Sequence, residues 1–467
     1  MSGGTAVLTR PPEPVAEREA GTRWTVDLVL LTALLVLTMM LGRSFSKLAV
    51  GGHEVYPTEW FLGAIAVAAL WRCGPRGAWA RLSGTLPMAV LAVLWVLGAV
   101  ATLRGLADYG FSLVSHDVGL VEYSVLLPLA ALAVDTRERA AALMRVLLYA
   151  SAASALFYAV ARFFPDFLDF APNPDPAACL YAFVVLAYVA TRAVYGFTVS
   201  AWLWAVSAVA LLIQAAYGGR TGVVAVAAVI AVLAAFAPPR RRLIVAGASI
   251  AAFVVALALS GPVTDGIQAV DVRDSAVAQQ EQDRMAGGDG GDGRRGRVPA
   301  VRALENTFDP NTAGGDSANA SWRIDFWRYM VEETADQPLF GVGFGRPAAF
   351  AWNGARYDFR QDDPNNPFDY TGPHNSFVNL LYRTGPIALL AVVALLALAA
   401  RRAWSWWRPE RPPSDRATLL QVALMFVFAA AIACFNVALE APQMGLFFWL
   451  PLALLFVLPR VWTRAER

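Results

Sequence analysis

The chain repeats apolar runs that are long enough to cross the hydrocarbon core of a membrane, and this pattern leaves few folds open to it. Hydrophobic residues make up 57% of the sequence and charged residues only 16%, against about 25% charged in a typical soluble domain. The runs predict an all-α, polytopic integral membrane protein with about 12 transmembrane helices, since one span needs about 20 residues. The predicted spans are residues 24–42, 57–71, 87–103, 119–134, 146–161, 177–191, 199–216, 222–237, 243–260, 377–400, 417–436 and 445–459.

Arginines are concentrated in alternate loops between these spans. The loops around Arg72, Arg137, Arg240 and Arg401 are arginine-rich, whereas the short loops between them hold few basic residues. Basic loops favour the cytoplasmic side of a membrane. Both termini are therefore expected in the cytoplasm. The first span is interpreted as an uncleaved anchor, because no small-residue cleavage site follows it closely.

One long polar segment interrupts the series of spans on the predicted outer side of the membrane. It contains 18 Asp and Glu residues and 11 Arg residues, so its charge is opposite to that of the inner loops. The predicted organisation is a disordered cytoplasmic tail, a first bundle of about nine helices, the large extracytoplasmic loop, and the last three helices with a cytoplasmic tail. These parts are residues 1–23, 24–260, 261–375 and 376–467.

The two halves of this loop differ in composition. Residues 273–297 are rich in Gly, Asp, Gln and Arg, which is typical of a flexible linker. Calcium binding is the alternative interpretation of the Gly/Asp run at 287–293. Calcium-binding runs of this kind come as repeated arrays, however, and this one occurs once. Residues 320–375 are expected to be folded.

The folded half is predicted to contain an amphipathic helix and a tight turn. Trp322, Phe326 and Met330 fall at helical spacing within residues 321–331, and Ser321 is a plausible N-cap. The glycine-rich run 341–345 lacks the strand and helix of a dinucleotide fold. A turn that brings the backbone close to another segment is the favoured interpretation.

The sequence predicts neither a cofactor nor a metal site. The three histidines, His53, His116 and His374, lie far apart and have no cysteine partners in a zinc pattern. The three cysteines are interpreted as packing residues. A Walker A motif is absent from the sequence, and no nucleic-acid partner is expected.

Three charged or titratable residues stand at predicted helix N-termini on the outer side. Arg220 begins the eighth span, Arg323 begins the loop helix, and His374 precedes the tenth span, where Asn375 or Ser376 can cap the helix. Helix N-termini present free N–H groups and a positive dipole end, which suit phosphate. Arginine adds paired donors that match phosphate oxygens. A diphosphate at the membrane surface fits this arrangement.

Each of these residues also has a plainer interpretation. Arg220 is equally explained as a loop arginine near lipid head groups, and His374 as a histidine bonded to backbone. Arg323 alone is better explained by pairing with Asp325 or Glu332 on a solvated face, because exposed ion pairs are common. The functional interpretation therefore rests on the three residues together and on the motifs around them.

These motifs resemble the O-antigen ligase and O-antigen polymerase superfamily, which are bacterial membrane glycosyltransferases. Gly219-Arg220-Thr221-Gly222 is similar to the family's arginine at the outer end of a core helix. Residues 322–345 are similar to its R-x-x-x-W and N-P-L-x-G-x-G element, with Gln337 where Asn is frequent. Residues 374–387 are similar to its H-N-x-x-L element, with Arg383 near a position where an acidic residue is common.

The resemblance implies a polyprenyl-diphosphate-linked oligosaccharide as donor and a hydroxyl of a glycan, lipid or protein as acceptor. It implies that Arg220 and Arg323 bind the donor diphosphate and that the catalytic residue His374 orients or deprotonates the acceptor hydroxyl, without a metal and with inversion. The expected location is the cytoplasmic membrane, with the active site on its extracytoplasmic side. Possible sugar or acceptor contacts are Trp322, Trp327, Asn375 and Tyr370, with further outer-side aromatic residues at Trp352 and Tyr357.

Two questions stay open at this point. A ligase and a polymerase share these motifs, so the sequence does not separate them. The alternative from another class is a lipid-linked glycan transporter or flippase. Transporters usually place ionisable groups near the bilayer midplane, whereas ionisable residues here gather near the span ends, with Asp27 as an exception close to one end.

Overall fold

The computed structural model describes most of the chain between residues 24 and 465. The described ranges are residues 24–46, 48–50, 53–163, 176–217, 219–270, 316–337, 339–352, 355–359, 373–408 and 410–465. Side chains at some positions inside these ranges are not described, among them residues 216–217, 219–220, 351–352 and 355–359. The predicted tail at 1–23 and the predicted linker at 273–297 lie outside the described residues.

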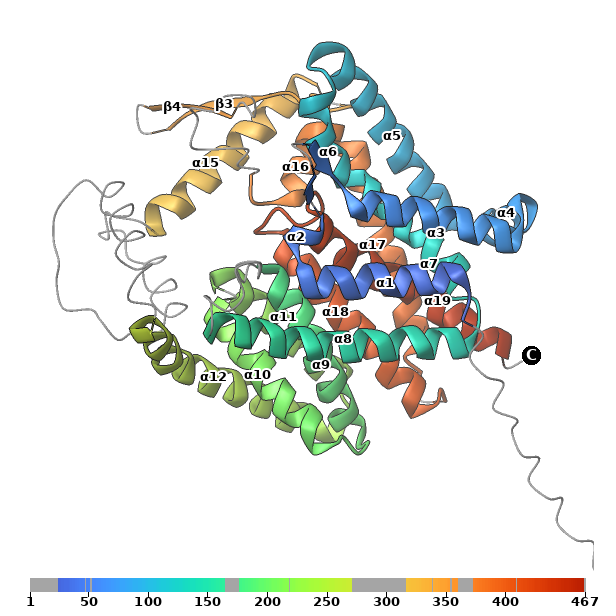
Figure 1. Cartoon of the computed structure of the whole chain (residues 1–467), viewed down its shortest axis with the longest axis vertical. Helices are drawn as coiled ribbons and strands as arrows, with labels where there is room; N and C mark the ends of the chain where they lie inside the picture. The colour runs from blue at the N-terminus through green and yellow to red at the C-terminus, as the bar shows by residue number, and fades with distance from the viewer. Residues whose placement is uncertain are drawn as a thin grey trace, which may run out of the picture.

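Helices make up nearly all of the described structure (Figure 1). Several begin at or next to a proline, such as Pro57, Pro386 and Pro413, because proline is pre-organised for the first helical turn. The first half contains α1 (Val26–Leu41), α2 (Arg43–Ser46), α3 (Pro57–Cys73), α4 (Pro75–Leu82), α5 (Leu86–Asp108), α6 (Phe111–Glu122), the 3₁₀ turn η1 (Tyr123–Val125), α7 (Leu126–Ala133), α8 (Arg137–Phe163) and α9 (Pro176–Tyr195).

The second half continues the bundle and adds the loop helix. It contains α10 (Ala201–Tyr217), α11 (Gly219–Phe236), the 3₁₀ turn η3 (Pro239–Arg241), α12 (Arg242–Val270), α15 (Asp316–Ala335), α16 (Ser376–Thr384), α17 (Pro386–Trp406), α18 (Pro413–Ala433) and α19 (Pro442–Ala465).

Each of the twelve predicted spans overlaps helical residues, although the span 119–134 runs through α6, η1 and α7. The protein is an all-α, multi-pass membrane protein. Eight helical stretches in the described part of the chain are long and apolar enough to cross a membrane. α1, α10 and α11 are shorter apolar helices. The number of crossings and the side on which the termini lie stay predictions. The predicted span 377–400 is divided into α16 and α17 at Gly385, whose φ of 82° ends the first helix before Pro386 begins the second.

Two short antiparallel hairpins interrupt the helical pattern, and the sequence analysis did not predict them. β1 (Leu48–Val50) pairs with β2 (His53–Val55) between α1 and α3. β3 (Ala348–Trp352) pairs with β4 (Ala355–Phe359) after α15, with Phe350 opposite Tyr357. α15 and the second hairpin stand together at one side of the bundle (Figure 1).

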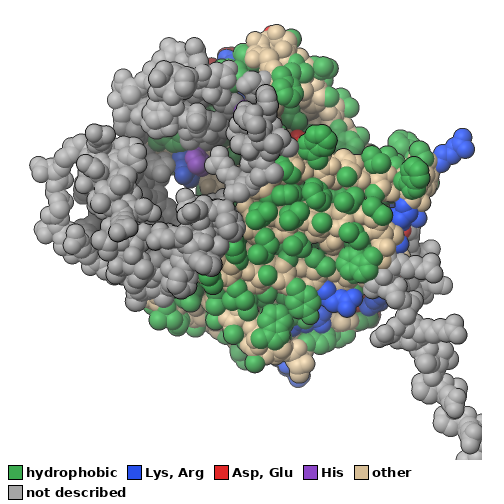
Figure 2. Space-filling view, viewed as in Figure 1, with side chains coloured by type: hydrophobic (Ala, Val, Ile, Leu, Met, Phe, Trp, Pro, Cys, Tyr) green, Lys and Arg blue, Asp and Glu red, His purple; other side chains and the backbone are tan. Residues whose placement is uncertain are grey.

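One hydrophobic core joins the first bundle to the last three helices. α19 is the most enclosed candidate span, with 89% of its apolar window buried, whereas α12 has only 11% buried. α9, α11 and α18 pack against one another. On the outside of the bundle, hydrophobic side chains cover a broad face (Figure 2). An apolar outer surface of this extent suits contact with lipid.

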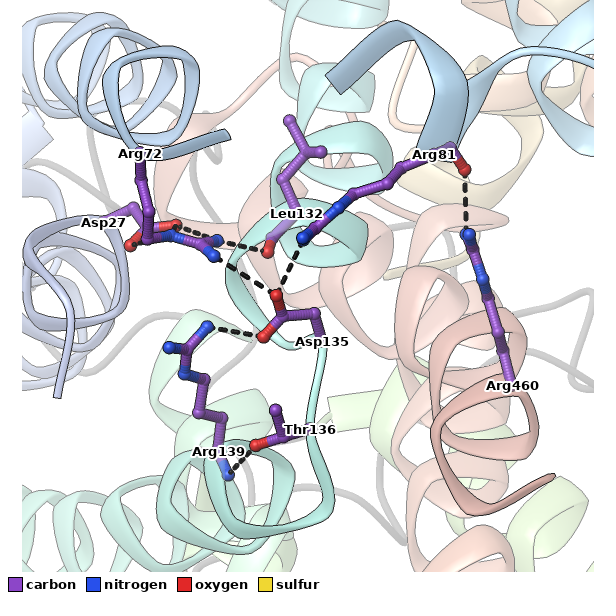
Figure 3. Close-up of polar contacts among 8 residues, drawn as sticks. All are labelled: Asp27, Arg72, Arg81, Leu132, Asp135, Thr136, Arg139 and Arg460. Atoms are coloured by element: carbon purple, nitrogen blue, oxygen red, sulfur yellow. Dashed lines mark hydrogen bonds and ion pairs between the residues drawn. The ribbon is translucent and has the colours of Figure 1, made fainter. Parts of the chain in front are cut away.

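One end of the bundle is held together by a network of arginines and aspartates (Figure 3). Arg72 Nη2 lies 2.8 Å from Asp27 Oδ2, and Arg72 Nη1 lies 3.1 Å from Asp135 Oδ2. Asp135 also pairs with Arg81 at 2.7 Å and with Arg139. The network joins the ends of α1, α3, α4 and α8, whose arginine-rich loops were predicted to share one side of the membrane.

Candidate functional site

The candidate site lies at the end of the bundle opposite this arginine network. His374 stands two residues before α16, and Asn375 is the N-cap. The Asn375 Oδ1 atom accepts hydrogen bonds from the backbone N–H groups of Phe377 and Val378, both at 3.1 Å. The predicted cap at the start of this helix is therefore confirmed. His374 itself has a φ of 50°, a left-handed conformation that residues other than glycine adopt infrequently.

The imidazole of His374 is half-buried and lies near Arg323. Burial, together with the positive charge of Arg323, lowers the pKa of His374 to about 4. Removing the ring from water disfavours its charged form, and a nearby cation has the same effect. His374 is therefore neutral at pH 7. The structure brings together two of the three residues that the sequence analysis grouped.

Arg323 does not stand at a helix N-terminus, so this part of the prediction is wrong. α15 begins at Asp316, and both Ser321 and Arg323 lie inside it. The helix therefore begins five residues before the predicted cap at Ser321. The Arg323 Nη1 atom donates to the carbonyl oxygen of Phe435 at 3.3 Å. Arg323 therefore bridges α15 and the loop between α18 and α19.

The aromatic side chains of α15 form a small core beneath the site. The ring of Trp322 lies 5.3 Å from that of Phe326 and 5.8 Å from that of Phe350 on β3. The indole N–H of Trp327 donates to the carbonyl oxygen of Pro373, which directly precedes His374. Both tryptophans therefore connect α15 to its surroundings, and contact with a sugar stays a prediction for each.

A buried carboxylate, which the sequence analysis missed, holds the start of α16. The Ser376 hydroxyl donates to Glu440 Oε2 at 2.5 Å, and the Asn379 amide donates to Glu440 Oε1 at 2.7 Å. Ser376 Oγ also accepts from the backbone N–H groups of Ala438 and Leu439. The first turn of α16 is thus fixed to the loop that follows α18.

Burial raises the pKa of Glu440 above its ordinary value, the hydrogen bonds from Ser376 and Asn379 oppose this, and the charge of Asp117 adds to it. Glu440 is the lone acidic residue between the last two apolar spans. That isolation was the signal available in the sequence.

The glycine-rich turn approaches other backbone segments closely, as predicted. Val342 N donates to the Tyr382 carbonyl oxygen at 2.8 Å, and Gly343 N donates to the Arg383 carbonyl oxygen at 3.0 Å. A Cβ atom on Gly341 would lie 2.4 Å from the Tyr382 oxygen, which leaves no room for a side chain. The turn therefore rests directly on the C-terminal end of α16.

A buried ion pair secures this contact to α6. Arg383 Nε lies 3.1 Å from Asp117 Oδ2, and both side chains are almost fully buried. The same Asp117 oxygen accepts from Gly345 N at 2.7 Å, while Arg383 Nη1 donates to the Arg346 carbonyl oxygen at 2.5 Å. Arg383 stands near a position where the resemblance led us to expect an acidic residue. The structure gives it a partner on another helix.

Other predicted residues are only partly described. Arg220 is the second residue of α11, so its place at a helix N-terminus is confirmed, but its side chain lies outside the described ones. Tyr370 falls outside the described residues, and the side chains of Trp352 and Tyr357 are not described. In the part of the chain that the structure describes, no group of three or more His, Cys, Asp or Glu side chains is placed to hold a metal ion.

Comparison with known proteins shows which family the segment around this site resembles. Residues 205–393 match the O-antigen ligase family, and this segment contains Arg220, Arg323 and His374. An O-antigen ligase of Pseudomonas aeruginosa is 28% identical over 140 residues, which is 30% of this chain and 31% of that relative. The similarity therefore spans about a third of the length of the relative.

Proposed function

The chain belongs to the O-antigen ligase and polymerase superfamily, and from this premise we propose that it transfers a glycan from polyprenyl diphosphate to an acceptor hydroxyl. The reaction takes place on the outer face of the cytoplasmic membrane, during the synthesis of a surface polysaccharide. The observation that carries the proposal is the neutral, half-buried His374 beside Arg323 at the start of α16. Family membership does not favour the transporter alternative.

Arg323 supplies a fixed positive charge for the donor. Its guanidinium is held by the Phe435 carbonyl oxygen, and an arginine fork matches the oxygens of a diphosphate. Arg220, at the N-terminus of α11, adds a second arginine if its side chain joins the site. As the bond from the anomeric carbon to the diphosphate breaks, its electron pair passes to the leaving oxygen. Charge stabilisation at that oxygen is the larger catalytic contribution in many enzymes.

His374 acts on the acceptor. The acceptor hydroxyl oxygen attacks the anomeric carbon from the face opposite the diphosphate, its proton passes to the imidazole, and the configuration inverts. An imidazole with a pKa of about 4 is a weak base. A bound diphosphate would offset the charge of Arg323 and raise the pKa of His374 toward its ordinary value. Donor binding would thus prepare the base.

Residues behind His374 position it. Asn375 caps α16, while Ser376 and Asn379 fix its first turn to Glu440. Trp327 holds the carbonyl of Pro373. The imidazole is thereby placed by hydrogen bonds on both sides of it along the chain. Such support of a reacting group is what limits its misplacement during catalysis.

A transfer assay with purified protein tests the proposal. Protein in detergent would receive a polyprenyl-diphosphate oligosaccharide, and the products would be separated on a gel. We expect His374→Ala and Arg323→Gln to lose at least about 100-fold in rate, the lower range for a general base or charge stabiliser. Arg328→Gln is the matched control, because Arg328 lies on the same helix but is 65% exposed.

The products also separate the two members of the superfamily. A ladder of longer lipid-linked glycans without added acceptor indicates a polymerase. Transfer that occurs only after a candidate acceptor is added indicates a ligase. Full activity in a well-folded His374→Ala protein would contradict the role assigned to the imidazole.

A further inference from the structure

A cavity of about 580 Å³ lies at the arginine-rich end of the bundle, far along the helices from His374. Its walls come from the end of α4, the first turn of α5, part of α7, and the last turns of α17 and α19. α4 and the C-terminal end of α19 lie on the side of the bundle opposite α15 (Figure 1). The cavity is therefore separate from the site proposed for glycan transfer, and a ligand assigned to it is independent of the proposed reaction.

The cavity has an excess of positive charge. Four arginines line it, namely Arg81, Arg401, Arg402 and Arg460, against the single carboxylate of Asp135. Asp135 is already matched, since it pairs with Arg72 and Arg139 as well as with Arg81. Burial alone would raise the pKa of Asp135, but these three guanidinium groups lower it overall.

Arg401 and Arg402 carry the part of this charge that the protein does not neutralise. Both are exposed residues in the last turns of α17. Among the described residues, neither guanidinium forms an ion pair, whereas Arg81 pairs with Asp135 at 2.7 Å. Two adjacent arginines at the rim of a cavity attract an anion from outside the protein.

The other half of the cavity is lined by apolar side chains. Leu86, Leu127, Leu398 and Phe456 line it. α5 and α17 contribute two of these residues, and each of these helices has only 28% of its apolar window buried. Trp404, near the rim on α17, is 70% exposed, and exposed tryptophans gather at the interface between lipid and water. An exposed tryptophan beside a basic cavity is the combination expected at the level of the lipid head groups.

We propose that this cavity binds the anionic head group of a phospholipid from the surrounding bilayer, with its acyl chains lying along α5 and α17. The phosphate would meet Arg401 and Arg402, and the first methylene groups would lie against Leu86 and Leu398. A soluble phosphate would leave the apolar wall unused. Basic pockets between membrane helices bind anionic lipid head groups by the same combination of charge and apolar surface.

Native mass spectrometry of the full chain in detergent tests this site. Dioleoyl phosphatidylglycerol and dioleoyl phosphatidylcholine would be titrated separately, and the bound lipid counted. The pocket variant is Arg401→Gln with Arg402→Gln. The matched control is Arg76→Gln with Arg408→Gln, which removes the same charge from exposed positions that do not line the cavity. We expect the pocket variant to bind phosphatidylglycerol about 30-fold more weakly and the control to change little.

A second variant and a second ligand make the outcome specific. Leu398→Trp fills the apolar half without changing charge, so it should also weaken phosphatidylglycerol binding. Equal losses in the pocket and control variants would mean general surface attraction and would overturn the proposal. So would equal affinity for phosphatidylcholine, or displacement of the lipid by an equimolar amount of glycerol 1-phosphate, which would identify a site for soluble phosphate.

Discussion

Replacing Arg383 with methionine tests how the candidate site is attached to the membrane bundle. The substitution keeps much of the side-chain volume and removes the charge that faces Asp117 at 3.1 Å. Arg383 is 4% exposed and Asp117 is 1% exposed. The variant therefore leaves a carboxylate in the interior without its cation.

The loss of stability depends on which hydrogen bonds the groups around Arg383 retain after the substitution. Removing one member of a buried ion pair destabilises a protein by about 3–5 kcal/mol. Asp117 retains the hydrogen bond from Gly345 N at 2.7 Å, so the lower part of that range applies. The Arg346 carbonyl oxygen loses a donor at 2.5 Å, which adds about 1 kcal/mol. We expect the free energy of unfolding to fall by about 4 kcal/mol.

Equilibrium unfolding in mixed micelles, followed by tryptophan fluorescence, measures this change. The double variant Asp117→Asn with Arg383→Met removes both charges and leaves an acceptor for Gly345 N. If Arg383 and Asp117 interact as described, the loss of stability in the double variant should be smaller than the sum of the losses in the two single variants by about 2 kcal/mol. Arg328→Met is the control, because its pair with Asp325 is exposed and contributes about 0.5 kcal/mol or less.

Two results would refute this reasoning. A loss below about 1 kcal/mol in Arg383→Met, similar to that of the exposed control, would mean that the pair is hydrated. Strictly additive losses in the double variant would mean that the two charges do not interact. A specific coupling would instead support the role of Arg383 in joining the glycine turn to α6.

Two further predictions concern the site. Because burial and Arg323 lower the pKa of His374 to about 4, the unfolded chain binds a proton that the folded chain does not between about pH 6.5 and 4. Stability should therefore fall by at most about 3 kcal/mol as the pH drops through that window. Thermal unfolding of His374→Gln should lack this component, and identical pH profiles would contradict the assignment. Gly341→Ala should destabilise by about 3 kcal/mol, because the φ of 62° and a Cβ 2.4 Å from the Tyr382 oxygen act together. Gly84 has a φ of 74° and open space around it, so Gly84→Ala should show the cost of backbone strain alone, about 1 kcal/mol. Equal losses of Tm in the Gly84→Ala and Gly341→Ala variants would mean that the clash with the Tyr382 oxygen adds nothing.

The helices were predictable because a segment that crosses a membrane must be apolar over its whole length, and such a run is visible in the local sequence. An apolar run such as 413–433 or 86–108 needs no tertiary partner to be recognised. The tight turn at 341–345 was predictable for a similar reason, since alternating glycines report a backbone that other chain segments approach. The place of Asn375 as a cap followed from its position immediately before the tenth span.

Contacts between distant segments were not predictable from these patterns. Ser376 and Glu440 are 64 residues apart, and Gly345 and Asp117 are 228 apart. A hydrophobic period reports which face of a helix is buried but not what lies opposite it. Arg323 was placed at the wrong point of its helix, because helix ends are the least reliable feature of a sequence-based assignment.

The left-handed backbone at His374 has a consequence for how this position balances folding against activity. A φ of 50° at a residue with a Cβ costs on the order of 1–2 kcal/mol, and glycine would adopt it without that cost. A chain optimised only for stability would therefore place glycine there. The histidine at this position therefore lowers the stability of the fold. If His374 acts on the acceptor as proposed, replacing it with glycine should stabilise the protein and lower its activity, which is the trade-off expected of a catalytic residue.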